Sequence, residues 1–307
     1  MTTVISGDAS LRNQFRWALV AIVAMAMIQP SLAKQPDAAA DAPVESVITM
    51  QVDGSLTFGT TGEVESYQID TKVMEPIRLP LENAVRKWKF KPVLVDGVPR
   101  RAFTRMRVTL AAKEVAAGLQ IRVDNVVFPI GKGEVVTRID GEVEPITGKK
   151  QGPPSYPAGL MRQGVGGMVL LAIRVDAEGR AAEVLPVQSM LFDVRGRPQT
   201  LHKAILVLEK SALTAAKAWT FNVPPTAKPR TVDDMTITVP IEYTVATKPL
   251  PAGEWRTVVR IPKREIGWLK PAAGTQSVGV ADAVSGEVIP LTTSVALATD
   301  VIGSDLL

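Results

Sequence analysis

The chain has no cysteine and a single histidine, His202, among its 307 residues. Without these side chains it cannot form disulfide bonds, use a thiol as a nucleophile, or hold iron–sulfur clusters or zinc ions through cysteine and histidine. An excess of charge is also lacking, because 35 Lys and Arg stand against 31 Asp and Glu, a formal net of +4. This charge is far from that of typical nucleic-acid-binding proteins. The composition excludes many classes of enzyme and favours no particular partner.

Long hydrophobic runs are scarce as well. The longest covers residues 17–28, fewer than the ~20 residues of a membrane-spanning helix. It follows Arg12 and Arg16 and precedes the small residues Ser31 and Ala33, as in a cleaved signal peptide. We expect residues 1–33 to be a signal peptide, or alternatively a membrane anchor, and residues 34–45 to be a linker.

What remains is a globular composition, 46% hydrophobic and 21% charged, with enough chain for two domains. In the first part, Asp53-Gly54 predicts a hairpin between two short apolar stretches, and a turn at residues 59–62 precedes a strand at 64–69. Helical spacing begins after Pro80 and ends near Trp88. A turn at Asp96-Gly97 and an alternating strand at 102–110 follow.

A similar pattern returns later in the chain. It comprises predicted strands at 167–175 and 181–187, a turn at 176–179, a helix at 201–219 and a final strand at 235–243. Trp88 and Phe90, at the end of the first helix, align with Trp219 and Phe221, at the end of the second. The repetition predicts two degenerate copies of one β-β-α-β unit, each anchored by large aromatic side chains.

Residues 153–245 resemble the C-terminal domain of TonB-family proteins. The resemblance lies in five motifs in order, which include Tyr156-Pro157, the Gly-rich stretch with Gly167, the turn with Gly179, the helix end with Trp219 and Phe221, and the closing strand. The first copy is similar at Trp88, Phe90 and Asp96-Gly97 but lacks the Tyr-Pro opening.

The resemblance implies an α+β fold of two small modules, each an antiparallel three-stranded sheet packed by helices, plus a β-rich C-terminal extension. Such domains lie in the periplasm and bind a protein partner of the cell envelope, typically an outer-membrane transporter, by adding an extended segment to a sheet edge. The implied edge residues are Thr236, Ile237, Thr238 and Val239 in the second copy and Arg105, Arg107 and Thr109 in the first. Pro240, which lacks an N–H, is expected to shorten the second edge.

These expectations divide the chain into a module at 46–117, a β-rich connector at 118–150, a TonB C-terminal-like domain at 151–246 and an extension at 247–307. The extension carries an alternating stretch at 256–260 and an apolar stretch at 291–302, and is either a third small β unit or a dock for the partner. No catalytic residue, cofactor or metal ligand is predicted, and the lone His202 is expected at the surface.

An inner-membrane energy transducer is the alternative function. Such a transducer needs a retained membrane helix, and the only membrane contact then expected is through residues 12–28. It also needs a long Pro-rich spacer, whereas residues 34–45 are too few to cross a periplasm. A periplasmic hydrolase would need a nucleophile–base pair that the sequence does not offer. The stripe of Arg101, Phe103, Arg105 and Arg107 is either a solvated strand face or a contact for an acidic partner or a phospholipid surface, and export disfavours nucleic acid.

Overall fold

The computed structural model describes residues 44–116, 118–128, 144–226, 228–244, 252–269, 288–291 and 295–306. The predicted leader, most of the linker, residues 129–143 of the predicted connector and residues 270–287 of the predicted extension lie outside these ranges. Residues 42–307 make one compact unit. The first half of this unit contains β1 (Glu45–Phe58), β2 (Val64–Ile69), α1 (Glu75–Val85), β3 (Val93–Val95), β4 (Val98–Arg100), β5 (Ala102–Val115) and β6 (Gly118–Val127).

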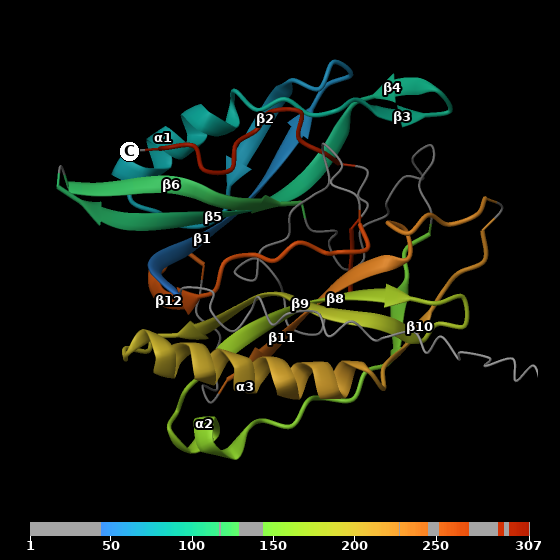
Figure 1. The fold of residues 1–307 in the computed structure, drawn as a ribbon. Coiled ribbons are helices and arrows are strands. Elements are labelled where there is room, and N and C mark those ends of the chain that lie inside the picture. Colours follow the sequence, from blue (N-terminus) through green and yellow to red (C-terminus); the bar gives the residue numbers. More distant parts are fainter. Residues whose placement is uncertain are drawn as a thin grey trace, which may run out of the picture. The chain divides into compact units, whose positions relative to one another are not determined.

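The second half and the C-terminal extension complete the unit (Figure 1). The second half contains β7 (Thr147–Lys150), α2 (Ala158–Arg162), β8 (Gly167–Val175), β9 (Ala181–Phe192), α3 (Pro198–Ala216), β10 (Thr220–Asn222) and β11 (Thr236–Tyr243). The extension contributes β12 (Arg256–Arg260) and β13 (Ile289–Pro290).

The expected fold of two separate three-stranded modules is wrong. The strands of both halves form one antiparallel nine-stranded sheet in the order β13-β11-β8-β9-β12-β1-β5-β6, with β2 also paired to β1. The strand that joins the halves is β12, which pairs with the end of β9 on one side and with the start of β1 on the other. β12 lies on the side of β9 opposite β8 and on the side of β1 opposite β5, so it continues the sheet from one half into the other.

The repeated unit itself is present within the continuous sheet. In each half a turn leads to a second strand, a helix follows, and the last strand pairs beside the first. The N–H of Phe90 bonds to the carbonyl of Gly62 at 2.7 Å, and the N–H of Phe221 bonds to that of Gly179 at the same distance. Both glycines have positive φ (85° and 79°), and a Cβ on either would overlap the carbonyl of the bonded Phe. The predicted alignment of the two aromatic pairs therefore matches equivalent local geometry.

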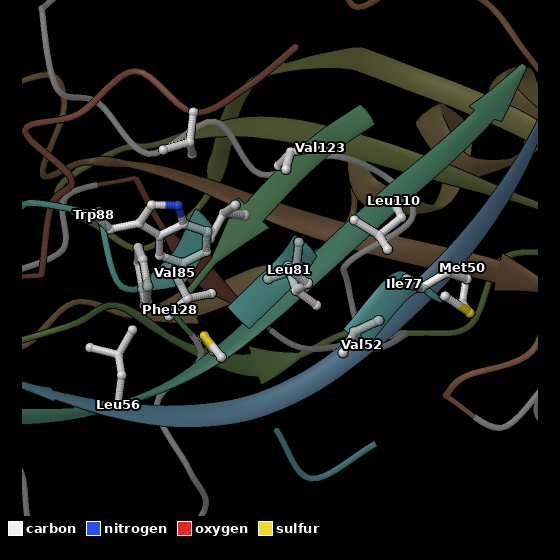
Figure 2. Packing of buried hydrophobic residues seen from close by; sticks show 14 of the residues in the cluster. Met50, Val52, Leu56, Ile77, Leu81, Val85, Trp88, Leu110, Val123 and Phe128 are labelled. Atoms are coloured by element: carbon white, nitrogen blue, oxygen red, sulfur yellow. The ribbon is translucent and has the colours of Figure 1, made fainter. Parts of the chain in front are cut away.

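Three apolar clusters hold the unit together. In the first half, Leu81 and Val85 of α1 pack over Met50 and Val52 of β1 with Leu110 of β5 (Figure 2). In the second half the buried face of α3 covers β8, β9 and β11 around Trp219 and Phe221. A third cluster draws on both halves and on β12, with Val47, Ala111, Val127, Met168, Leu170, Ala172, Val187, Met190 and Val258 as its buried members. Because this cluster needs side chains from both halves, neither half is an independent module.

Two local expectations are also wrong. Asp53-Gly54 makes no hairpin, because β1 runs straight through it between β5 and β2, and Gly54 lies opposite both Met106 and Ile69. The first helix begins before Pro80 rather than after it, since Pro76 at the first turn is compatible with a helix start.

Candidate functional site

The edge residues predicted in the second half lie on β11, whose outer side is already occupied. Thr236, Ile237, Thr238 and Val239 are all buried and pair with β8. On the other side, Ile237 lies opposite Pro290 and Thr238 opposite Ile289 of β13. The chain's own extension has therefore added a short strand at the position where the resemblance predicts a partner segment.

Two hydrogen bonds show which residues of β11 turn their backbone groups towards this edge. Leu291 donates its N–H to the carbonyl of Thr236 at 3.4 Å, and Val175 of β8 donates to the carbonyl of Met235 at 2.8 Å. Successive residues of a strand point their backbone groups to opposite sides. The backbone groups of Thr236, Thr238 and Pro240 consequently face outwards, away from β8.

Pro240 sits where its missing N–H costs the sheet nothing. Its ring nitrogen faces the outer edge, so the ladder with β8 loses no donor. By the same alternation, Pro290 lies opposite the inward-facing Ile237 and turns its own nitrogen away from β11. Both prolines therefore limit the addition of further strands beyond the short β13.

Side chains reinforce the seat of the covering segment. Thr238 donates its hydroxyl to the carbonyl of Ile289 at 3.3 Å, and the indole N–H of Trp268 donates to the hydroxyl of Thr236 at 3.1 Å. Val288 and Ile289 pack against the apolar clusters, and Leu291 is buried. The edge of β11 thus accepts an extended segment with apolar side chains.

The edge predicted in the first half is wrong for Arg107 and Thr109, because β5 is an interior strand there. It pairs with β1 on one side and with β6 on the other over nine residues, from Arg107 to Val115. Arg107 forms an ion pair with Asp53 at 2.6 Å, and Thr109 is buried between β1 and β6. Arg105 lies beyond the end of β6, opposite Ser55 of β1.

The other residues of the family motif are structural. Tyr156 donates its hydroxyl to the carbonyl of Val165 at 2.8 Å and meets the ring of Tyr243 edge to face, at 5.4 Å between centroids. Burial raises the pKa of both tyrosines. Pro157 is the N-cap of α2, and Gly167 allows close approach of the carbonyl of Met190.

The aromatic anchors of both copies are buried. The indole of Trp219 donates to the carbonyl of Gly152 at 2.8 Å, while the ring of Phe90 stacks on that of Phe58 at 4.4 Å. Trp88 and Phe221 lie in the cores of their halves. These positions fix the helix on the sheet and offer no surface to a partner.

A feature that the sequence did not reveal is that the extension covers several other backbone edges. Gly303 and Ser304 exchange hydrogen bonds with Val123 of β6 at 2.7 and 2.9 Å. Residues 296–298 pair in the same way with Lys89 and Lys91, beside Phe90. The alternation at 256–260 and the apolar content of 291–302 were the only signals, and neither identifies the strand that each segment meets.

Buried charges attach the extension to both halves. Arg260 of β12 forms a two-bond contact with Asp124 of β6, at 2.6 and 2.9 Å, and also bonds to Glu45 at 3.2 Å. Burial opposes the charge of Arg260, but the hydrogen bond and charge of Asp124, together with Glu45, outweigh it and raise the pKa of Arg260. Arg264 in turn bonds at 2.9 Å to Glu209 of α3.

Residues suited to chemistry are not gathered in the described part of the chain. His202 is buried on α3, so the expectation of a surface position is wrong. The described ranges contain no group of three or more acidic or histidine side chains that could hold a metal ion. Asp234 caps the local turn at Thr231 with a 2.9 Å hydrogen bond.

Among the helices in the described ranges, none combines the length and apolar character needed to cross a membrane. Comparison with protein-family models, with curated proteins and with solved structures gives no match.

Proposed function

We propose that the protein is a non-enzymatic binding protein of the cell envelope that captures an extended segment of a protein partner at the edge of β11. The observation that supports this is the occupation of that edge by residues 288–291 of the same chain. An added strand gains affinity from main-chain hydrogen bonds and specificity from its alternate side chains. In this proposal β13 holds the place of the partner and is displaced by it.

The hold of β13 is slight compared with the ladders elsewhere in the sheet. Within the described residues 288–291, two residue pairs join β13 to β11, whereas eight join β11 to β8. The partner segment that fits the edge is short, extended and apolar at the positions of Ile289 and Leu291. Pro240 has no N–H to donate to the partner segment. The main-chain hydrogen bonds that hold the segment therefore come mainly from Thr236 and Thr238.

The location and the class of partner rest on sequence. Residues 1–33 have the pattern of an export signal, and residues 153–245 resemble TonB-family C-terminal domains. Both support a periplasmic protein with an envelope partner, for which an outer-membrane transporter is the family's example.

Displacement can be tested with a fluorescent peptide of residues 286–293 added to the full chain. Ile289→Asp weakens the internal segment, so the peptide should bind this variant more than tenfold more tightly than it binds the wild type. A further Thr238→Pro change removes an outward N–H while leaving the β8 ladder, and should abolish peptide binding.

Thr238→Val in the same Ile289→Asp background is the matched control, because it keeps the N–H and loses only the hydroxyl. It should retain most of the binding. If the peptide binds equally well to the Thr238→Pro variant, strand addition at β11 is refuted.

A further inference from the structure

The hairpin of β3 and β4 stands apart from the nine-stranded sheet. Its strands pair only with each other, and its turn places Asp96 and Gly97 at positive φ (53° and 73°), as a tight two-residue hairpin turn requires. Figure 1 shows the hairpin extending beyond the start of β5. An isolated two-stranded hairpin is marginal in water, and only Val93 at its base is buried in the core.

The hairpin and the start of β5 expose large apolar side chains. Leu94 is 40% exposed, Val98 48% and Phe103 61%. Leu94 lies opposite Pro99 and Val95 opposite Val98, so that apolar groups lie on both faces of the hairpin. Exposure of these apolar side chains to water is unfavourable.

The segment that carries these apolar groups is also rich in basic residues. Residues 87–105 include six basic side chains and one acidic residue, Asp96; the basic ones are Lys87, Lys89, Lys91, Arg100, Arg101 and Arg105. Acidic side chains lie beside some of them: Arg101 bonds to Glu65 at 2.6 Å, and Lys89 lies 3.5 Å from Glu63. The surface still has a clear excess of positive charge.

The second half lacks this combination at the equivalent place. Residues 223–235 connect β10 to β11 without a hairpin, and their two basic side chains are balanced by Asp233 and Asp234. The basic and apolar hairpin is therefore no general property of the repeated unit.

We propose that the β3–β4 hairpin and Phe103 dock on a membrane surface that contains anionic phospholipid. The basic side chains meet the lipid phosphates, and Leu94, Val98 and Phe103 enter the boundary between headgroups and acyl chains. Asp96 at the turn keeps the hairpin at headgroup depth, because a carboxylate is costly further in. The proposal is independent of strand addition at β11.

The absence of cysteine makes a direct test possible. A single Val98→Cys change in the full chain gives a unique attachment point for an environment-sensitive fluorophore. Val232→Cys is the matched control, because Val232 is 49% exposed in the equivalent connection of the second half. On vesicles containing phosphatidylglycerol, the probe at 98 should brighten and shift to the blue while the probe at 232 does not. This comparison also separates the hairpin from any vesicle binding by residues 17–28.

Charge variants complete the test. Arg100→Gln with Arg105→Gln should weaken the response at 98 by about 30-fold, whereas Lys210→Gln with Lys228→Gln should leave it unchanged. No response at 98, an equal response at 98 and 232, or an equal response to phosphatidylcholine alone would overturn the proposal. A response to soluble polyglutamate that matches the vesicle response would assign the surface to acidic proteins and overturn it as well.

Discussion

The corresponding last strands of the two halves differ in how their outer sides are covered. In the first half, β6 covers β5 with nine residue pairs, whereas in the second half the described part of the extension covers β11 with two. The two copies thus share a fold but not an accessible edge. One half therefore has a last strand closed along most of its length, and the other has a last strand with a short cover.

Chain connectivity accounts for this difference. β6 follows β5 almost immediately, so pairing them closes a very short loop. β13 begins about 45 residues after β11 ends, and the closure entropy of a loop rises with its length. Pairing of β6 with β5 therefore costs little loop-closure entropy and is long. Pairing of β13 with β11 is short and more easily displaced.

The largest loss of stability should come from a substitution in β6, the strand that covers β5. Val123 on β6 is fully buried, so Val123→Asp places an unpaired charge in the core and should lower the free energy of unfolding by about 5 kcal/mol or more. Ile289→Asp on β13 is the matched change in the strand that covers β11 and should cost about 1 kcal/mol. Chemical denaturation of both variants measures the difference, and similar losses would contradict the contrast between the two edges.

A smaller loss should follow from cutting the link between the halves. Arg260→Ala leaves the partly buried carboxylate of Asp124 without its main partner and should lower the free energy of unfolding by about 3 kcal/mol. Replacing both, as Arg260→Met with Asp124→Leu, should restore much of the loss because no buried charge is then left alone. If the double variant is no more stable than Arg260→Ala, the pair does not explain the loss.

The smallest change in stability should come from the turn between the first two strands of the repeated unit, which differs between the two halves. In the second, the backbone N–H of Arg180 bonds to Asp176 and, with the guanidinium, lowers the pKa of that carboxyl, whereas Gly59 occupies the equivalent position in the first. A lowered carboxyl pKa adds stability above its unfolded pKa of about 4.

This added stability disappears as the pH falls through the lower pKa of the folded state. Asp176→Asn should therefore lower stability at neutral pH and reduce the loss of stability between about pH 5 and pH 2. Thermal melts across this range test it. A variant as acid-sensitive as the wild type would exclude this carboxyl as a source.

Local sequence patterns predicted most elements within each half. Alternation placed β5, a preceding turn placed β2, apolar content placed β8, and helical spacing placed α3. Prediction was less reliable where tertiary contacts overrule a local signal. Asp53-Gly54 is a strong turn pair, but here it lies between two neighbouring strands, where Asp53 pairs with Arg107.

The joining of the halves could not be predicted from the same patterns. The alternation at 256–260 indicates a strand but not its neighbours, because strand pairing depends on edges that only the folded halves create. The sequence placed a candidate edge at residues 236–239, and the structure shows that this edge of β11 pairs with β13. Its cover by residues 288–291 was not predicted, since the segment contributes only two paired residues and one of them is a proline.

The place of β12 has a consequence for the timing of assembly. Arg260 bonds to Glu45 across 215 residues of sequence. A ribosome that adds 5–20 residues per second needs on the order of ten to forty seconds between these two positions. Throughout that interval the sheet lacks the strand that joins its halves, so a nascent chain exposes the facing edges of β9 and β1 until β12 has been made.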